Sequence, residues 1–247
     1  PLALAAGWWA TCAALGAVGA VLAVLVQTTI REPERVAVDE LMADTYPVRS
    51  GGVVWVLTAA ASFRLAASYT LASFLPVYYV RTRLPGYSAG AYGTANAVIV
   101  SAAGLLSALA GGVLADALGA EFAAAPSMVA AAAQAVAAGL FVGVFAASTF
   151  AGSLCFYGCA LLVGECWYGL TLVQAKSVVP SEVQSQTVTM MLSVATLLSN
   201  VCPALVGVFD PGTAQLGLLM LGTISGGVVL AGAALALAAW EIGAGAR

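Results

Sequence analysis

Residues 53–80 read VVWVLTAAASFRLAASYTLASFLPVYYV, and Arg64 is the single charged side chain among these twenty-eight residues. About 20 consecutive apolar residues in a helix cross the hydrocarbon core of a bilayer, so this stretch predicts a transmembrane helix. A cation near the middle of such a helix costs at least about 2.5 kcal/mol to insert. We therefore expect Arg64 to have a partner of opposite charge and to mark a functional position.

The composition of the whole chain is typical of a membrane protein. Of its 247 residues, 62% are hydrophobic and 8% are charged, whereas soluble domains carry roughly 25% charged residues. A single water-soluble core would not bury this much apolar surface, so lipid is the expected solvent for much of it. The net charge is −3 and no basic patch occurs, so we expect no nucleic-acid partner.

Six further apolar runs have the length and composition of membrane spans. The predicted spans are 2–26, 53–80, 88–115, 126–146, 151–174, 185–208 and 214–240. A backbone in lipid must satisfy its hydrogen bonds internally, so each span must be a helix. The predicted fold class is therefore an all-α integral membrane protein, a bundle of about seven transmembrane helices.

The polar segments divide the chain into a single span and a group of six. Residues 27–52 form the one long charged connection, between a first span at 1–26 and a bundle at 53–240, and residues 241–247 form a tail. Lys and Arg are more frequent in this connection, in the 175–184 loop and in the tail than on the opposite side. The positive-inside rule therefore predicts a cytoplasmic linker and C-terminus, without specifying which membrane.

Cysteine and histidine usage argues against metal and hydrolytic chemistry. All five cysteines fall inside apolar runs, and the chain has no histidine. Cys155, Cys159 and Cys166 share a helical face by spacing, and we interpret them as small packing residues rather than as metal ligands. Ser/His hydrolysis and His-ligated metal catalysis are excluded. We expect no enzyme activity and no cofactor.

Glu165 is the second charge that lies deep inside an apolar run. Arg64 lies ~16 Å from the inner end of its predicted span and Glu165 ~14 Å from the inner end of its own, at 1.5 Å per helical residue. Both side chains therefore lie close to the midplane, where transporters bind substrates and coupling ions. Two interpretations remain: a buried structural ion pair, or a pair on a substrate or proton pathway.

Aromatic residues accompany both charges. Tyr69 follows Arg64 by five residues, and Trp167 and Tyr168 follow Glu165 by two and three. Aromatic rings beside a charge suit an amphipathic ligand, although they are also common packing residues. A carboxyl group at the midplane can bind and release protons, so proton-coupled transport is a further hypothesis for Glu165.

The segment GGVLADALG at 111–119 resembles the G-x-x-x-D-R-x-G-R loop of the major facilitator superfamily. Gly112, Asp116 and Gly119 match that pattern, and Ala117 and Ala120 replace its two arginines. The resemblance implies a gating loop at these three positions, where the third span enters a cytoplasmic loop.

Other segments resemble the spinster-like subgroup of the same superfamily, in the same order. These segments are Gly7-Trp8-Trp9 with Arg31-Glu32-Pro33, Arg64 to Tyr69 with Phe74, Pro76 and Tyr78, and Glu165 to Gly169 with Val179-Pro180. The resemblance implies that the chain corresponds to spans six to twelve of a twelve-span transporter. The missing N-terminal half of the same protein would then be its partner.

The same resemblance implies a function. Spinster-like transporters export lysophospholipids, sphingolipids or related amphipathic anions by alternating access, and the first and fourth helices of each half line their cavity. Those helices carry Arg64 and Glu165 here, so Arg64 would contact a head-group phosphate or act in gating. The expected partners are membrane lipid and a small-molecule or lipid substrate.

Two other classes remain as alternatives. A seven-span receptor would have the same span count, but the long linker after the first span and the missing cysteine pair in outer loops disfavour it. A membrane scaffold that does not transport would explain the two lost arginines. An intramembrane enzyme is disfavoured because the chain has no histidine and neighbouring spans lack paired aspartates.

Overall fold

The structure is a computed structural model that describes residues 2–29, 50–209 and 212–245, all of them in helices or in the short turns between helices. The α-helices are α1 (Leu2–Thr29), α2 (Ser50–Thr82), α3 (Ala89–Gly119), α4 (Ala125–Ala146), α5 (Phe150–Gly164), α6 (Trp167–Ser177), α7 (Gln184–Ser199), α8 (Val201–Val208) and α9 (Gly212–Gly245). A short 3₁₀-helix, η2 (Ser181–Val183), precedes α7.

The predicted fold class is confirmed. Within the described residues the chain has no strand and has seven helical spans long and apolar enough to cross a membrane. Five spans are single helices, and the other two are α5 with α6 and α7 with α8. Seven such spans indicate a multi-pass membrane protein.

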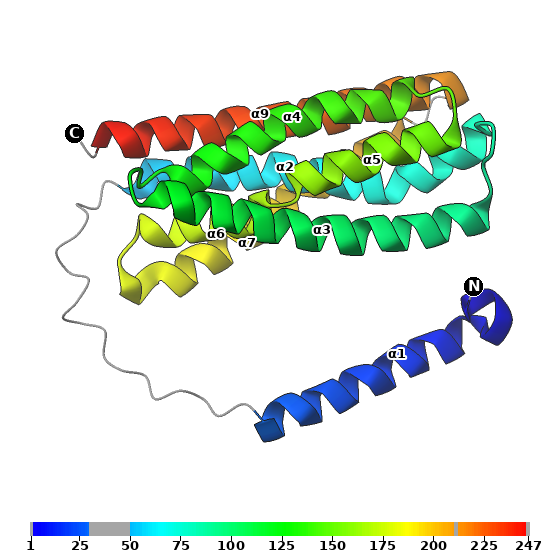
Figure 1. Cartoon of the computed structure of the whole chain (residues 1–247), viewed down its shortest axis with the longest axis horizontal. Coiled ribbons are helices and arrows are strands. Elements are labelled where there is room, and N and C mark those ends of the chain that lie inside the picture. Colours follow the sequence, from blue (N-terminus) through cyan, green and yellow to red (C-terminus); the bar gives the residue numbers. More distant parts are fainter. Residues whose placement is uncertain (1, 30–49, 210–211, 246–247) are drawn as a thin grey trace. The chain divides into compact units, whose positions relative to one another are not determined.

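The chain divides into two compact units, Pro1–Thr45 and Tyr46–Arg247. In the first unit, α1 is the described element, and its described side chains are exposed to solvent or lipid. The second unit is an antiparallel bundle of the remaining spans (Figure 1). The start of α2, the α3–α4 turn, the α6–α7 turn and the end of α9 lie together at one end of the bundle (Figure 1).

The helix packing in the bundle follows a repeated pattern. The helix α2 packs on α9 and α7, and in the same way the α5–α6 span packs on α4 and α3. The helices α4 and α9 also pack on each other. If the first three spans of the bundle are exchanged with the last three, each of these packed pairs maps onto a packed pair. Consecutive spans run in opposite directions, so a shift by three spans also reverses the direction of each helix. The bundle therefore has the packing of two inverted three-helix repeats, with α2 and α5–α6 in equivalent places.

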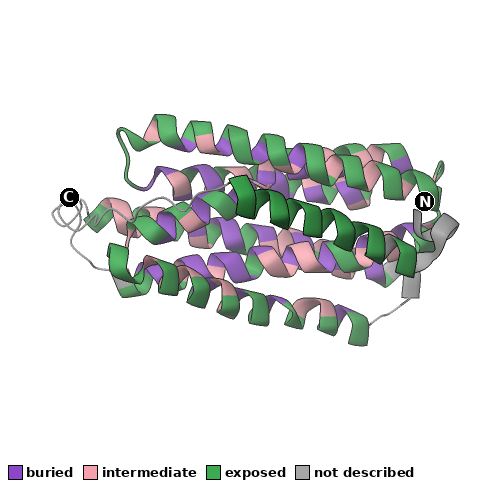
Figure 2. Cartoon of the chain, turned by 90° about the horizontal axis from the view of Figure 1, so that it is seen from below, coloured by how far each residue is buried: buried purple, intermediate pink, exposed green. Residues whose placement is uncertain are grey.

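The core lies between the helices, and their outer faces are exposed (Figure 2). At the end of the bundle near the α2–α3 turn, aromatic rings fill the core. Tyr79 meets Phe150 edge to face at 5.2 Å, and its hydroxyl lies 2.7 Å from Ser153 Oγ. The Ser153 hydroxyl in turn donates to the Val144 carbonyl. This hydrogen-bonded aromatic cluster joins α2, α4 and α5, and each of its two buried hydroxyls has a hydrogen-bond partner.

Three helices extend beyond the predicted spans. The helix α2 begins at Ser50 rather than at 53, and α9 continues to Gly245, through most of the predicted tail. Both ends are stabilised by packing, since Ile242 packs against the core cluster that includes Leu57 of α2. The third span continues to Gly119, so the predicted loop is helical. The remainder of the predicted linker, residues 30–49, lies outside the described residues.

The sixth predicted span, 185–208, is interrupted at Asn200. Pro203 lies in the first turn of α8 and has no N–H group to donate to the preceding turn. The Asn200 side chain compensates in part, because its Nδ2 donates to the Thr196 carbonyl at 2.7 Å. The proline was visible in the sequence, but apolar composition alone predicted one continuous helix.

Among the described glycines, Gly111 lies closest to a neighbouring helix. A Cβ atom at Gly111 would lie 2.3 Å from Cys166 Cβ, whereas a Cβ atom at the neighbouring Gly112 would meet nothing within 4 Å. We therefore predict that Gly111→Ala lowers the free energy of unfolding by about 1–3 kcal/mol through overpacking, and that Gly112→Ala leaves it unchanged. Thermal unfolding in detergent checks both variants, and equal stability of the two would contradict the packing.

Candidate functional site

The fifth membrane span is interrupted at its centre, between α5 and α6. Glu165 and Cys166 form a turn there. The Gly164 carbonyl accepts a hydrogen bond from Gln134 Nε2 at 2.7 Å, and the Cys166 N–H donates to Ser107 Oγ at 2.9 Å. Side chains of α4 and α3 thus replace helical hydrogen bonds within the span. A break in a spanning helix is stable only where protein or water satisfies the freed groups.

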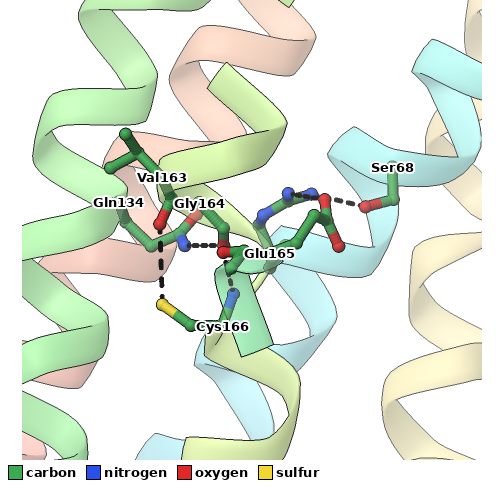
Figure 3. Close-up of polar contacts among 8 residues, drawn as sticks. Ser68, Gln134, Val163, Gly164, Glu165 and Cys166 are labelled. Carbon is green, nitrogen blue, oxygen red and sulfur yellow. Dashed lines mark hydrogen bonds and ion pairs between the residues drawn. The ribbon is translucent and has the colours of Figure 1, made fainter. Parts of the chain in front are cut away.

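The two predicted charges meet at this interruption; Figure 3 shows Glu165 there with Gly164, Cys166 and Ser68. Arg64 Nη2 lies 2.5 Å from Glu165 Oε1, as both an ion pair and a hydrogen bond. Arg64 lies thirteen residues after the start of its span at Gly51, and Glu165 lies fifteen after the start of its own at Phe150. The expectation that Arg64 has a partner of opposite charge is therefore confirmed, and the partner is on the equivalent helix of the other repeat.

The two partners of the ion pair differ in burial. The Arg64 side chain is 1% exposed and that of Glu165 is 29% exposed. Arg64 is also held by two further contacts, since Nη1 donates to Ser68 Oγ and the guanidinium lies over the Trp167 ring at 5.7 Å. Among the described residues, Arg64 is the one hydrogen-bond partner of the Glu165 side chain. The cation is thus fixed in the core, and the carboxylate faces outward.

Glu165 lies on an exposed stripe of the α5–α6 span. Leu162 precedes it by three residues and is exposed, and Gly169 follows by four and is exposed. A Cβ atom at Gly169 would meet nothing within 4 Å, so there is open space one turn from the carboxylate. A charged side chain at this depth does not face lipid. The stripe therefore borders water or another protein surface.

The structure brings Trp167, but not every predicted aromatic residue, to the ion pair. Trp167 is buried against Arg64. Tyr168 is 44% exposed and meets the edge of the Trp167 ring at 5.4 Å. Tyr69 lines a separate hollow of about 290 Å³. The other residues of this hollow are Ala72, Ser73, Asn200 and Pro203. It adjoins the break between α7 and α8.

The predicted gating residues lie in the last turns of α3. Gly112 is partly exposed, and Asp116 and Gly119 are exposed. A Cβ atom at Gly112 or at Gly119 would meet nothing within 4 Å. Within the described residues, the glycines of this motif therefore make no close helix contact. Any gating role for these three residues depends on contacts outside the described part of the chain.

An exposed polar stripe along α7 was not predicted from the sequence. Its members are Gln186, Thr189, Ser193, Thr196 and Asn200. Spacings of three and four place all of them on one helix face. Met191, Ala195 and Ser199 form the buried face of α7. Met190 and Leu197 are exposed and apolar and lie three residues before and four after Ser193, so they border the polar stripe. Helical periodicity applied to polar residues would have detected this stripe.

Three further polar residues support the ion pair and the helix break, and two of them, Ser107 and Gln134, were not predicted from the sequence. Ser68, Ser107 and Gln134 are ordinary residues in apolar runs, and their role depends on contacts with the α5–α6 span or with Arg64. Ser68 alone had a sequence signal, since it follows Arg64 by one helical turn. Cys155 and Cys159 contact each other and are exposed, whereas Cys166 is buried, so the three do not share one face. Over residues 2–29, 50–209 and 212–245, no group of three potential metal ligands occurs.

Comparison of the chain with protein-family models, with curated proteins and with solved structures found no match. Function is therefore inferred from the arrangement of the described residues.

The unequal burial of the ion pair predicts unequal effects of breaking it. Glu165→Met leaves Arg64 buried without a counter-charge, and we expect the free energy of unfolding to fall by about 3–5 kcal/mol. Arg64→Met leaves an outward-facing carboxylate, and a loss on the order of 1–2 kcal/mol is expected. Thermal unfolding in detergent, followed by helical circular dichroism, ranks the variants.

The double variant Arg64→Met with Glu165→Met serves as the control. It removes both charges, and apolar replacements of a buried pair are often neutral, so its stability should recover toward that of the parent. A loss equal to the sum of the two single losses would show that the charges do not act as a pair.

Proposed function

We propose that this chain forms one half of a membrane transporter of the major facilitator type, which moves a small or amphipathic organic solute by alternating access. The observation that carries the proposal is the Arg64–Glu165 ion pair, which joins the equivalent helices α2 and α5–α6 midway along their spans. Intramembrane ion pairs of this kind occur on substrate and ion pathways. An anchor or a scaffold has no need of one.

The repeat packing supports the same proposal. Inverted repeats are frequent in secondary transporters, whose binding sites lie near the midplane at the repeat interface and use interrupted helices. Here α2 and α5–α6 are equivalent helices, and the α5–α6 span is interrupted where the charges meet. Seven-span receptors are not characterised by inverted three-helix repeats, so this packing favours a transporter over a receptor.

The polar stripe on α7 supports a polar route beside the bundle. Thr189 and Asn200 satisfy part of their hydrogen bonding within the helix, yet a row of exposed polar groups remains costly against lipid. The hollow beside Asn200 continues from this stripe to Tyr69 and Ala72 of α2. Ala72 in turn lies two helical turns from Arg64, ~12 Å along the axis. We propose that stripe, hollow and ion pair border one aqueous pathway.

The proposal of a subgroup and a substrate rests on the sequence motifs. We propose a spinster-like transporter of lysolipids or sphingolipids, with proton coupling at Glu165 and a cytoplasmic C-terminus. The second half of the pathway would come from the N-terminal half of the same protein. This half would pack against the exposed faces of α7 and of the α5–α6 span, because those faces carry exposed polar groups.

Flux measurements with the complete protein test the transport proposal. In proteoliposomes, uptake of a fluorescent lysophospholipid should fall to background in Arg64→Met. The double variant Arg64→Met with Glu165→Met should fold like the parent and still fail to transport, because the charges themselves are needed on the pathway. Leu198→Ala, outside the polar stripe of α7, should keep the parental flux.

Two results would count against this proposal. Parental flux in the folded double variant would reduce the ion pair to a structural role. Background flux in the parent would leave a receptor or scaffold as the function to pursue.

Cysteine accessibility tests the aqueous pathway separately from flux. In a variant with its native cysteines replaced by Ser or Ala, Thr196→Cys should react with a charged, membrane-impermeant thiol reagent, because it lies on the polar stripe. Leu198→Cys, two residues after Thr196, on another side of the helix and 57% exposed, should not react. Similar reactivity at both positions would mean that the stripe does not border water.

A further inference from the structure

The more exposed partner of the ion pair is the negative one, Glu165, and this determines which charge a substrate meets. Arg64 is fixed by Glu165, Ser68 and Trp167 and is 1% exposed. An anionic group therefore has no access to the guanidinium while the pair is intact. Glu165, by contrast, is 29% exposed and accepts its hydrogen bond from Arg64 alone among the described residues. The group that an approaching solute meets is a carboxylate.

The surroundings of the carboxylate are apolar and open. Leu162 and Val173 are 44% and 56% exposed on the same span, and the absence of a side chain at Gly169 leaves space one turn from Glu165. Charge attraction at a partly buried carboxylate is stronger than in bulk water. A ligand that fits would combine a positive group for Glu165 with an apolar body for the neighbouring side chains.

We infer that Glu165 is the binding group for the positively charged part of an amphipathic organic cation or zwitterion, with Leu162, Gly169 and Val173 beside its apolar part. This inference rests on the proposed transport function and specifies its substrate class. It differs from the expectation drawn from the sequence, in which Arg64 binds a head-group phosphate. A lysolipid whose head group carries an ammonium group would supply the positive charge for Glu165, whereas a purely anionic lipid would not.

A matched pair of hydrophobic ions tests the sign of the ligand charge. Tetraphenylphosphonium and tetraphenylborate share size and shape and differ in charge. With the chain in lipid nanodiscs and empty nanodiscs as background, we expect saturable binding of the phosphonium and none of the borate. Saturable borate binding that is lost in Arg64→Met would overturn the inference.

Two variants locate the bound cation. Glu165→Gln should weaken phosphonium binding by about tenfold or more, which corresponds to about 1.4 kcal/mol or more. Gly169→Leu leaves the ion pair intact and fills the adjacent space, and we expect a similar loss. Gly104→Leu on α3, where a Cβ atom also meets nothing within 4 Å, should bind like the parent. Unchanged phosphonium binding in both Glu165→Gln and Gly169→Leu would place the ligand elsewhere and refute the site.

Carbodiimide labelling of the unmodified chain provides a test that does not depend on variant folding. A hydrophobic carbodiimide should modify Glu165, as detected by peptide mass spectrometry, and tetraphenylphosphonium should slow that reaction. Labelling of Glu165 that tetraphenylphosphonium does not slow would show that the cation binds elsewhere, and would overturn the inference.

Binding is measured without flux, so the inference and the transport proposal fail independently. Loss of lysophospholipid flux in the double variant, together with no phosphonium binding, would refute the substrate class alone. Phosphonium binding at Glu165 together with parental flux in the double variant would refute the role of the pair in transport.

Discussion

A charge pair in an apolar bundle constrains the helices around it. Arg64 is almost fully buried, and an isolated cation there would be far too costly, so Glu165 must lie within contact distance. This requirement fixes the rotation of both α2 and α5–α6 about their axes. It also fixes their relative height, because the two charged groups must meet at one depth.

The interruption of the α5–α6 span follows from the same constraint. Glu165 is in the turn between the two helices, where the backbone direction changes and the carboxylate reaches Arg64. This turn depends on hydrogen bonds from Gln134 to the Gly164 carbonyl and from the Cys166 N–H to Ser107. Gly111 allows α3 to approach closely enough for this, since a Cβ atom there would overlap Cys166. Packing, hydrogen bonding and charge are therefore coupled at one point of the bundle.

The arrangement also separates the surface of the bundle into chemically different faces. Apolar side chains such as Leu198 suit lipid, whereas the polar stripe on α7 and the exposed edge of Glu165 do not. A protein in a bilayer places such polar faces against water or against other protein. This is why we connect the ion pair, the hollow beside Tyr69 and the α7 stripe into one proposed pathway.

The sequence by itself determined three things: that lipid surrounds much of this protein, that its fold class is all-α, and that Arg64 and Glu165 are the charges deep inside its spans. Runs of 20 or more apolar residues leave a helix as the one stable spanning structure, and the cost of burying a charge is enough to single out Arg64 and Glu165 from the amino-acid order alone. The aromatic and motif residues were less well determined. Trp167 reaches the pair, but Tyr69 lies at another hollow, and Asp116 and Gly119 lie in a helix rather than a loop.

Only the tertiary structure decided which partner of the pair is accessible. Span lengths estimate depth along the membrane normal, but they contain no information on rotation about a helix axis. Arg64 is more buried than Glu165, because Ser68 and Trp167 hold its guanidinium in place. The helix breaks at Glu165 and Asn200 also depend on local hydrogen bonds rather than on hydropathy. The sign of the charge that the site offers to a ligand was therefore set by packing.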